Sequence, residues 1–178
     1  MGTSCPSGRP PLSRDSDMIF VTVGAQLPFD RLVRAVDLWA EENRAIKVFA
    51  QTGKGKYRPR YIEYIDFLSP PDFESRVRAA HCIVGHAGIG TIITAMEYAK
   101  PLLVMPRDAT LGEHRNNHQM DTARRFAPRQ HIEVAYNEEE LGKKITALIR
   151  TSNQYRSSSH SFQTSPELIK IIKDFISS

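Results

Sequence analysis

The sequence predicts an α/β fold, a doubly wound parallel sheet of the Rossmann-like type. Short apolar segments rich in β-branched residues alternate with segments whose apolar residues recur at helical spacing. The connections between these segments are short, as expected for strands that run parallel and are covered by helices on both faces. Glycine-containing turns follow two of the predicted strands, at Gly24 and at 85–90. Ligands of such sheets bind beyond the carboxyl ends of the strands, where these turns lie.

Six ranges have the composition of strands, and most of them are apolar enough for burial on both faces. The predicted strands are 18–23, 45–51, about 61–68, 82–85, 101–106 and 132–134. The range at 61–68 is more polar than the others, and 132–134 is short enough for an edge of the sheet.

Helical spacing of apolar residues places the helices between these strands. The predicted helices are about 28–43, a short helix that starts at 70, a helix from the glycine turn to about 99, a helix over 119–126, and a helix that begins near Asn137. Pro28 and Pro70 stand near helix starts, where the missing N–H has no intrahelical partner to lose. Asn137 and Glu140 have the spacing of a capping box.

The chain divides into four parts by composition. Residues 1–17 are rich in Ser, Pro, Gly and Arg and are interpreted as a disordered leader, and 18–150 form the ligand-binding domain. Residues 151–164 are interpreted as a Ser-rich linker. A terminal helix is expected over 165–178, with Ser165 as its N-cap and Pro166 at its first position.

Composition restricts the class of protein. The chain has 178 residues with 25% charged and 40% hydrophobic side chains, and no apolar run approaches the length of about 20 residues that spans a bilayer. Two cysteines fit a reducing compartment, so we expect a cytoplasmic protein unless a partner holds it at a membrane. The basic residues behind the net charge of +4 could bind phosphates or anionic lipid, or could belong to an ordinary solvated surface. No nucleic-acid-binding motif accompanies it, so no nucleic-acid partner is expected.

The stretch 83–97 carries the clearest chemical signal. An apolar run ends in a glycine-rich turn that opens into a helix, and a helix N-terminus offers unpaired N–H groups and the positive end of the helix dipole to a phosphate. Gly88 and Gly90 let the backbone approach a ligand, and His86 and Thr91 add side-chain donors. The pattern predicts a nucleotide-diphosphate site. The alternative is a strand-to-helix corner in which the glycines only ease the turn; the spacing is neither a P-loop nor a dinucleotide fingerprint, which argues against a Rossmann oxidoreductase.

Four motifs in a consistent order carry a resemblance to a known family. They are Val21-Thr22-Val23-Gly24 with Pro28-Phe29-Asp30-Arg31-Leu32, His86-Ala87-Gly88-Ile89-Gly90-Thr91, Lys100-Pro101-Leu102, and Asn117-His118-Gln119. Over about 18–150 the chain resembles the C-terminal, donor-binding domain of family 28 glycosyltransferases, equivalent to the C-terminal half of a GT-B enzyme. It is most similar to small subunits that consist of that domain alone, such as the catalytic half of the two-subunit transferase that makes dolichol-linked chitobiose, and to bacterial counterparts in exopolysaccharide biosynthesis.

The resemblance implies roles for individual residues. In that family, a His-Ala-Gly turn and the helix after it hold the diphosphate of a UDP-sugar. The matching residues here are His86, Gly88, Gly90 and Thr91, which are expected to contact the phosphates. The loop from Gly24 is expected to face the same phosphates. Further expected contacts lie elsewhere in the chain: the backbone of Phe67 and Leu68 at the uracil, and His118 and Gln119 at the donor sugar and phosphates. The alternative for the His-Gln pair is an ordinary polar helix start.

One position departs from the family pattern. An acid that binds the ribose hydroxyls is usual six residues after the glycine matching Gly88, and this chain has Thr94 there. Glu97, three residues further on the same helix, could substitute or could be a solvated surface residue. The ribose contact is therefore assigned to Thr94, Glu97 or both.

The resemblance also implies the reaction. We expect an inverting, UDP-sugar-dependent hexosyltransferase that uses no tightly bound metal and no other cofactor, with the helix N-terminus stabilising the departing diphosphate. The base that activates the acceptor is not located; Glu113 and His114 are candidates by loop position. Because the chain has length for one α/β domain, a membrane-anchored subunit is expected to bind a polyprenyl-diphosphate-linked saccharide acceptor at the cytoplasmic face. The alternative is a nucleotide-binding regulatory or scaffold subunit that does not catalyse.

Overall fold

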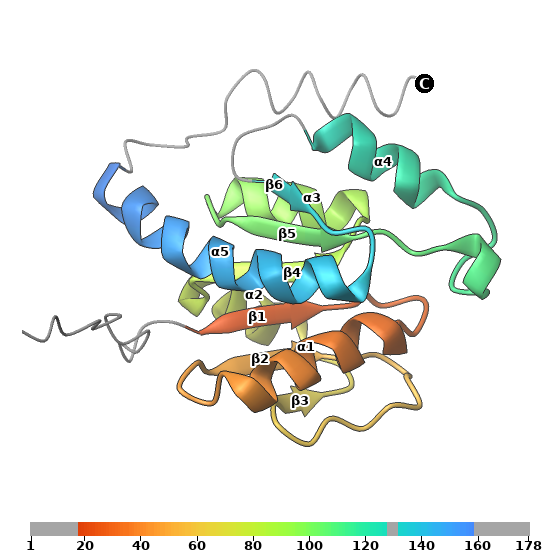
Figure 1. Ribbon diagram of the computed structural model, residues 1–178, viewed down its shortest axis with the longest axis horizontal. Helices are drawn as coiled ribbons and strands as arrows, with labels where there is room; N and C mark the ends of the chain where they lie inside the picture. The colour runs from red at the N-terminus through yellow and green to blue at the C-terminus, as the bar shows by residue number, and fades with distance from the viewer. Residues whose placement is uncertain (1–17, 128–131, 159–178) are drawn as a thin grey trace, which may run out of the picture.

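The computed structural model describes residues 18–127 and 132–158. Within these residues six strands form one sheet in the order β3-β2-β1-β4-β5-β6, and every neighbouring pair runs parallel (Figure 1). The strands are β1 (Ile19–Thr22), β2 (Val48–Gln51), β3 (Glu63–Ile65), β4 (Cys82–His86), β5 (Leu102–Met105) and β6 (Ile132–Val134). The doubly wound α/β prediction is confirmed.

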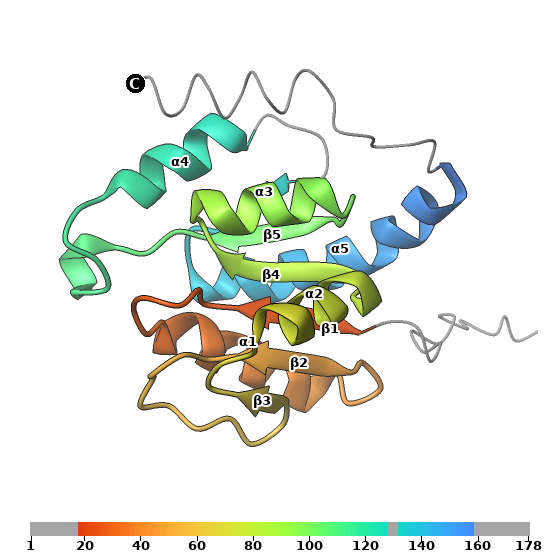
Figure 2. The ribbon, with the colours of Figure 1, turned by 180° about the vertical axis from the view of Figure 1, so that it is seen from behind.

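Helices cover both faces of the sheet. Figure 1 shows α1 (Asp30–Glu42) and α5 (Glu138–Ser158) on one face, and Figure 2 shows α2 (Pro70–Ala79), α3 (Ile89–Glu97) and α4 (His118–Phe126) on the other. A short 3₁₀ helix, η1 (Ala109–Leu111), interrupts the loop between β5 and α4. From β1 the strand order runs to β3 at one edge of the sheet, and from β4 it runs to β6 at the other edge. Doubly wound sheets bind ligands at this switch point between β1 and β4.

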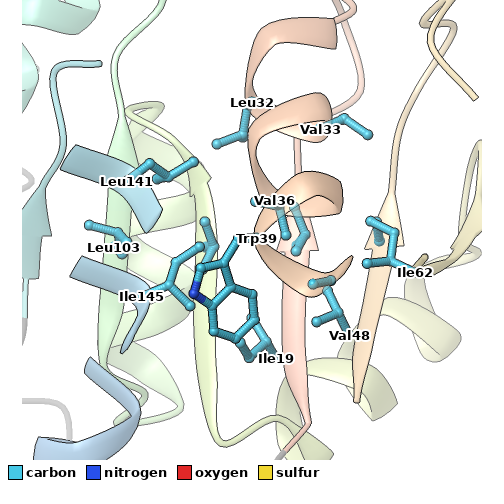
Figure 3. Packing of buried hydrophobic residues seen from close by; sticks show 14 of the residues in the cluster. Ile19, Leu32, Val33, Val36, Trp39, Val48, Ile62, Leu103, Leu141 and Ile145 are labelled. Atoms are coloured by element: carbon cyan, nitrogen blue, oxygen red, sulfur yellow. The ribbon is translucent and has the colours of Figure 1, made fainter. Parts of the chain in front are cut away.

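Two apolar layers hold the helices to the sheet. On the α1 and α5 side, Trp39 packs between Ile145 and the strands, and its indole N–H donates to Thr146 at 3.0 Å (Figure 3). On the opposite side, Phe20 and Ile83 from the sheet pack with Ile92 of α3. Burial on both faces explains why the central strands are continuously apolar.

The third strand is shorter than predicted. Only Glu63–Ile65 pairs with β2, whereas the prediction covered about 61–68. The flanking backbone has other partners: the N–H of Tyr61 donates to Asp37 at 2.8 Å, and the N–H of Leu68 donates to the side-chain oxygen of Gln51 at 3.2 Å. These side chains terminate the strand at both ends.

The last described helix is longer than predicted. Asn137 and Glu140 form the expected start, since Asn137 Oδ1 accepts from the Glu140 N–H at 2.8 Å and the Glu140 carboxylate accepts from the Tyr136 N–H at 3.1 Å. The helix then continues through Ser158, so the linker expected from 151 is helical at least to that residue. Serines interrupt the apolar period there but do not end the helix. The predicted leader at 1–17 and terminal helix at 165–178 lie outside the described residues.

A buried carboxylate fixes the long connection between β2 and β3. Asp37 of α1 has no exposed surface and accepts hydrogen bonds from the Tyr57 hydroxyl at 2.7 Å, the Arg60 N–H at 3.0 Å and the Tyr61 N–H at 2.8 Å. Burial, together with the hydrogen bond to Asp37, raises the pKa of Tyr57 to about 12. The connection is therefore tied to the domain core by one side chain.

We expect Asp37→Ala to lower the free energy of unfolding by about 3 kcal/mol, because it leaves donors of a buried network without their acceptor. Urea unfolding at neutral pH measures the change. The control is Glu42→Ala at the exposed end of the same helix, which should change stability by less than about 0.5 kcal/mol. Equal stability of the two variants would contradict the role given to Asp37.

Candidate functional site

A cavity of about 690 Å³ lies beyond the carboxyl ends of the strands, at the switch point between β1 and β4. Most residues predicted for the site line it, from four separate segments. The predicted residues in its lining are Gly24, Leu68, His86, Gly88, Gly90, Thr91, Thr94, His114, His118 and Gln119. Phe67, Glu97 and Glu113 are not among the lining residues.

Helix α3 points its N-terminus at this cavity. Gly88 is the N-cap and its residue type supplies no side-chain cap, so the first N–H groups of the helix lack the usual side-chain acceptor. Gly88, Ile89, Gly90 and Thr91 all line the cavity. The arrangement has the donors and the dipole that favour an anion.

Two of the glycines make room for a histidine ring. A β-carbon added at Gly24 would lie 2.7 Å from His86 Cε1, and one added at Gly88 would lie 2.3 Å from His86 Nε2. Gly24 also has a φ of +78°, which favours glycine independently. Both glycines are therefore required by the packing of His86, a reason that the sequence pattern did not reveal.

Gly90 differs from the other two glycines. A β-carbon added there would meet no atom within 4 Å, and the residue lies in the first turn of α3. Glycine in a helix is less stable than alanine by about 1 kcal/mol, so folding alone does not explain it. Its lack of a side chain keeps the backbone of the helix N-terminus open to the cavity.

His86 lines the cavity and is neutral at neutral pH. Burial lowers its pKa to about 4, the positive charge of Arg107 acts in the same direction, and hydrogen bonding to the Thr22 backbone opposes them. Nδ1 of His86 lies 3.3 Å from the Thr91 hydroxyl. At neutral pH His86 thus offers a hydrogen-bonding imidazole without a charge of its own.

Arg107 supplies a fixed positive charge behind the cavity. Its side chain is only 2% exposed and donates to the carbonyls of Val23 at 2.8 Å, Leu27 at 2.7 Å and Pro28. Its guanidinium also lies over the Phe29 ring, 4.6 Å from the centroid. Burial lowers the pKa of Arg107 to about 10, so the side chain stays protonated at neutral pH. It therefore shapes the loop after β1 and adds positive potential to the site.

The loop between β5 and α4 is anchored by Glu113. Its carboxylate accepts from Nε and Nη2 of Arg31, both at 2.7 Å, and from the Asp108 N–H at 2.9 Å. The hydrogen bonds that Arg31 donates to Glu113 raise the pKa of the Arg31 guanidinium. Since both carboxylate oxygens are engaged and the residue lies outside the cavity lining, Glu113 is placed as a loop anchor.

Glu113 leads directly to His114, which does line the cavity. The rings of His114 and His118 meet edge to face with centroids 4.4 Å apart, and burial followed by the charge of His114 lowers the pKa of His118. Gln119 is 4% exposed, and its side-chain oxygen accepts from the Arg107 N–H at 3.2 Å. The His-Gln pair thus lies at the cavity and is joined to Arg107.

The helix face at the cavity includes Thr94 but not Glu97. Thr94 follows Gly90 by one turn and lines the cavity, whereas Glu97 is exposed outside it. Phe67 is 41% exposed and lies outside the lining, and its neighbour Leu68 is inside.

Arg107 and Gln51 were not predicted as site residues, although both line the cavity. Arg107 directly follows Pro106 at the end of a buried strand, a position that could have suggested the site. Over the described residues, no group of three or more His, Cys, Asp or Glu side chains comes together to hold a metal ion.

The pKa of His86 predicts a pH-dependent stability. Unfolded His86 takes up a proton near pH 6.5 and the folded residue only near pH 4, so its contribution to folding is complete above pH 6.5 and falls as pH decreases toward 4. On lowering the pH from about 7 to about 5, the free energy of unfolding of the wild type should fall by about 2 kcal/mol more than that of His86→Gln. Urea unfolding of both proteins at the two pH values measures this difference, and equal losses would contradict the assignment of a buried neutral imidazole.

Comparisons with known proteins identify the family of this chain. Residues 18–172 match the family model "Glycosyltransferase family 28 C-terminal domain". The chain is 22% identical over 181 residues to the "UDP-N-acetylglucosamine transferase subunit ALG13" of Yarrowia lipolytica, covering 90% of this chain and 85% of that protein.

Two solved structures share the fold. The NMR structure of ALG13 matches with a TM-score of 0.55 and 21% identity, covering 74% of this chain and 85% of that one. The glycosyltransferase of kitacinnamycin matches with a TM-score of 0.59 and 16% identity, covering 84% of this chain. This chain spans only 39% of that longer enzyme. Because the family model matches residues 18–172, the chain belongs to the family of glycosyltransferase family 28 C-terminal domains.

Proposed function

We propose that this chain binds a UDP-sugar and is the donor-binding, catalytic subunit of a two-subunit inverting hexosyltransferase. The observation that carries the proposal is the uncapped N-terminus of α3, left open to a 690 Å³ cavity by Gly90. The acceptor is a polyprenyl-diphosphate-linked saccharide, and the product belongs to glycan or polysaccharide assembly. The family and the name of the relative from Yarrowia lipolytica support this choice over other nucleotide-binding functions.

The residues of the site assist departure of the diphosphate. As the bond to the sugar breaks, negative charge grows on the phosphate oxygens, and N–H donors that are already oriented stabilise it without reorganisation. The α3 N-terminus provides these donors, and buried Arg107 adds a positive charge that does not move. We propose no metal cofactor, because these groups supply the donors and the positive charge that the departing diphosphate needs.

The remaining contacts follow from placement in the cavity. Thr94 is assigned to the ribose in preference to Glu97, because only Thr94 lines the cavity. His118 and Gln119 face the donor sugar and phosphates. Of the two candidate bases we retain His114, which lines the cavity, since the carboxylate of Glu113 is held by Arg31.

A partner is proposed to complete the enzyme. The relatives bear the name of a transferase subunit, and the kitacinnamycin enzyme is much longer than this chain. Within the described residues no helix has both the length and the apolar character to cross a membrane. We propose that a membrane-anchored subunit binds the lipid-linked acceptor and holds this chain at the cytoplasmic face.

Calorimetric titration with UDP, ADP and NADH tests the donor site. We expect selective UDP binding that Gly90→Leu weakens at least about tenfold, because the added side chain occupies the space in front of the helix N-terminus. The same substitution should not reduce the free energy of unfolding, since leucine favours a helix over glycine.

Gly142→Ala in α5 is the matched control for that titration. A β-carbon there would meet Trp39 at an ordinary distance of 3.6 Å, and neither residue lines the cavity, so UDP affinity should not change. If neither the chain nor its complex with the partner bound UDP, or if Gly90→Leu bound it as well as wild type, the donor site would be misplaced.

Transfer assays test the division of labour between subunits. With a lipid-linked saccharide acceptor, the complex should transfer sugar and the isolated chain should not, because the acceptor site is completed by the partner. In the complex, Gly90→Leu should reduce kcat/KM at least about tenfold. Full activity of the isolated chain would contradict the two-subunit proposal, and normal activity of the Gly90 variant would favour a regulatory role for the nucleotide site.

A further inference from the structure

The connection between β2 and β3 carries basic side chains that the proposed function does not use. Its middle section is basic and contains no acid, and its basic residues are Lys54, Lys56, Arg58 and Arg60, all of them exposed. Within the part of the chain that the structure describes, Arg58 is the only one of the four with an ion pair, to Asp66 at 3.9 Å, and more than half of each of these two side chains is exposed. The other three cations therefore present their charges to solvent.

The backbone under these cations is held in place by two acids of α1. Asp30 accepts from the Lys56 N–H at 3.0 Å, and Asp37 accepts from the N–H groups of Arg60 and Tyr61. The two carboxylates thus bind the backbone of the connection, and its basic side chains remain exposed. Like charges that are fixed close together repel one another, so folding stability does not explain this composition.

Arginines on the outer side of α1 cover two tyrosines of the connection. Arg34 of the helix lies over the Tyr57 ring, and Arg44, just after the helix, lies over the Tyr61 ring, each 5.0 Å from the ring centroid. The outer side of α1 and the connection therefore form one continuous surface. We call it the basic face, meaning Arg34, Arg44 and residues 54–61.

Apolar and aromatic side chains are exposed beside the basic face. Leu38 follows Arg34 by one helical turn and is 52% exposed. Tyr64 of β3 pairs in register with Ala50, whose side chain packs in the core on the α1 side, so Tyr64 lies on that side too, where it is 38% exposed. Basic groups interspersed with exposed apolar and tyrosine side chains are typical of a surface that contacts the headgroup region of a bilayer.

The basic face extends to the cavity. A β-carbon added at Gly53, where the connection begins, would lie 3.7 Å from the Gly24 carbonyl oxygen, and Gly24 lines the cavity. Figure 1 shows the connection and the loop after β1 at the same end of the sheet. A ligand of the basic face therefore lies near the cavity.

We propose that the basic face binds directly to a lipid bilayer that contains anionic lipids. Anionic headgroups attract Lys and Arg side chains near the membrane surface, and each such side chain strengthens binding about fivefold. The inference goes beyond the proposed function, because it requires neither the nucleotide nor the partner. The partner and the basic face are then two separate contacts with the membrane, and stable attachment usually requires two.

The aromatic rings favour a bilayer over RNA, the other polyanion that basic side chains attract. Proteins that bind single-stranded RNA present free aromatic faces on which bases stack. Here Arg34 lies over one face of Tyr57, and Arg44 lies over one face of Tyr61. The charge is therefore matched to anionic headgroups without a stacking platform for bases.

Co-sedimentation of the full chain with lipid vesicles tests this proposal. We expect binding to vesicles of phosphatidylcholine with about 30% phosphatidylserine, at least about tenfold weaker binding to phosphatidylcholine alone, and a loss of binding as salt is raised. The triple variant Lys54→Gln, Lys56→Gln and Arg60→Gln should bind the anionic vesicles at least about tenfold more weakly than wild type. Its free energy of unfolding should be unchanged, because these side chains have no ion pair among the described residues.

The triple variant Arg78→Gln, Arg124→Gln and Lys143→Gln is the matched control. It removes the same number of charges from exposed side chains on α2, α4 and α5, each in a surface ion pair within its own helix. Its binding to anionic vesicles should fall by less than about threefold, because these residues lie outside the basic face.

Three outcomes would overturn the proposal: equal binding to the two kinds of vesicle, equal losses in the two triple variants, or binding to a single-stranded RNA oligonucleotide without binding to vesicles. The assay contains neither UDP nor the partner. Its failure therefore leaves the donor site in place, and failure of the UDP titration leaves the basic face in place.

Discussion

A buried guanidinium joins the parts of the site that are far apart in the sequence. Arg107 follows β5, yet its donors meet the carbonyls of Val23, Leu27 and Pro28, which lie about 80 residues earlier in the chain. Its own N–H meets Gln119 at the start of α4. Removing a charge from water is costly unless its donors find partners, and here three backbone carbonyls accept from the guanidinium without neutralising its charge. The loop after β1 therefore has one shape, and the positive charge remains available to the cavity.

The other polar groups of the site are likewise held by the fold. The α3 N-terminus contributes donors in fixed directions, Arg107 contributes charge, and His86 stays neutral because burial lowers its pKa to about 4. A second salt-bridge system, Arg31 with Glu113, holds the loop that carries His114 and His118 against the N-terminus of α1. Under the proposed function, donors and charge that are fixed before a substrate binds would stabilise a departing diphosphate.

The fold and the position of the cavity could be predicted from the sequence because both depend on local patterns. Apolar runs, their alternation with helical segments, and glycines after strand ends determined the sheet and its carboxyl edge, and the helix dipole at 88–91 follows from the turn alone. The contacts of Arg107, Gln51 and Glu113 could not be predicted, since each depends on which distant backbone groups the tertiary fold brings near. Likewise, the requirement for glycine at 24 and 88 arises from the ring of His86. The serines after 150 predicted a linker, whereas α5 continues through Ser158.

The central claim is that a nucleoside diphosphate binds with its phosphates on the N-terminus of α3. Backbone amide NMR of the ¹⁵N-labelled chain during a titration with UDP tests this residue by residue. The account predicts saturable shifts concentrated at the amides of Ile89, Gly90 and Thr91, with further shifts at Leu68 near the base. Saturable shifts confined to other surfaces, with the α3 amides unchanged, would contradict it.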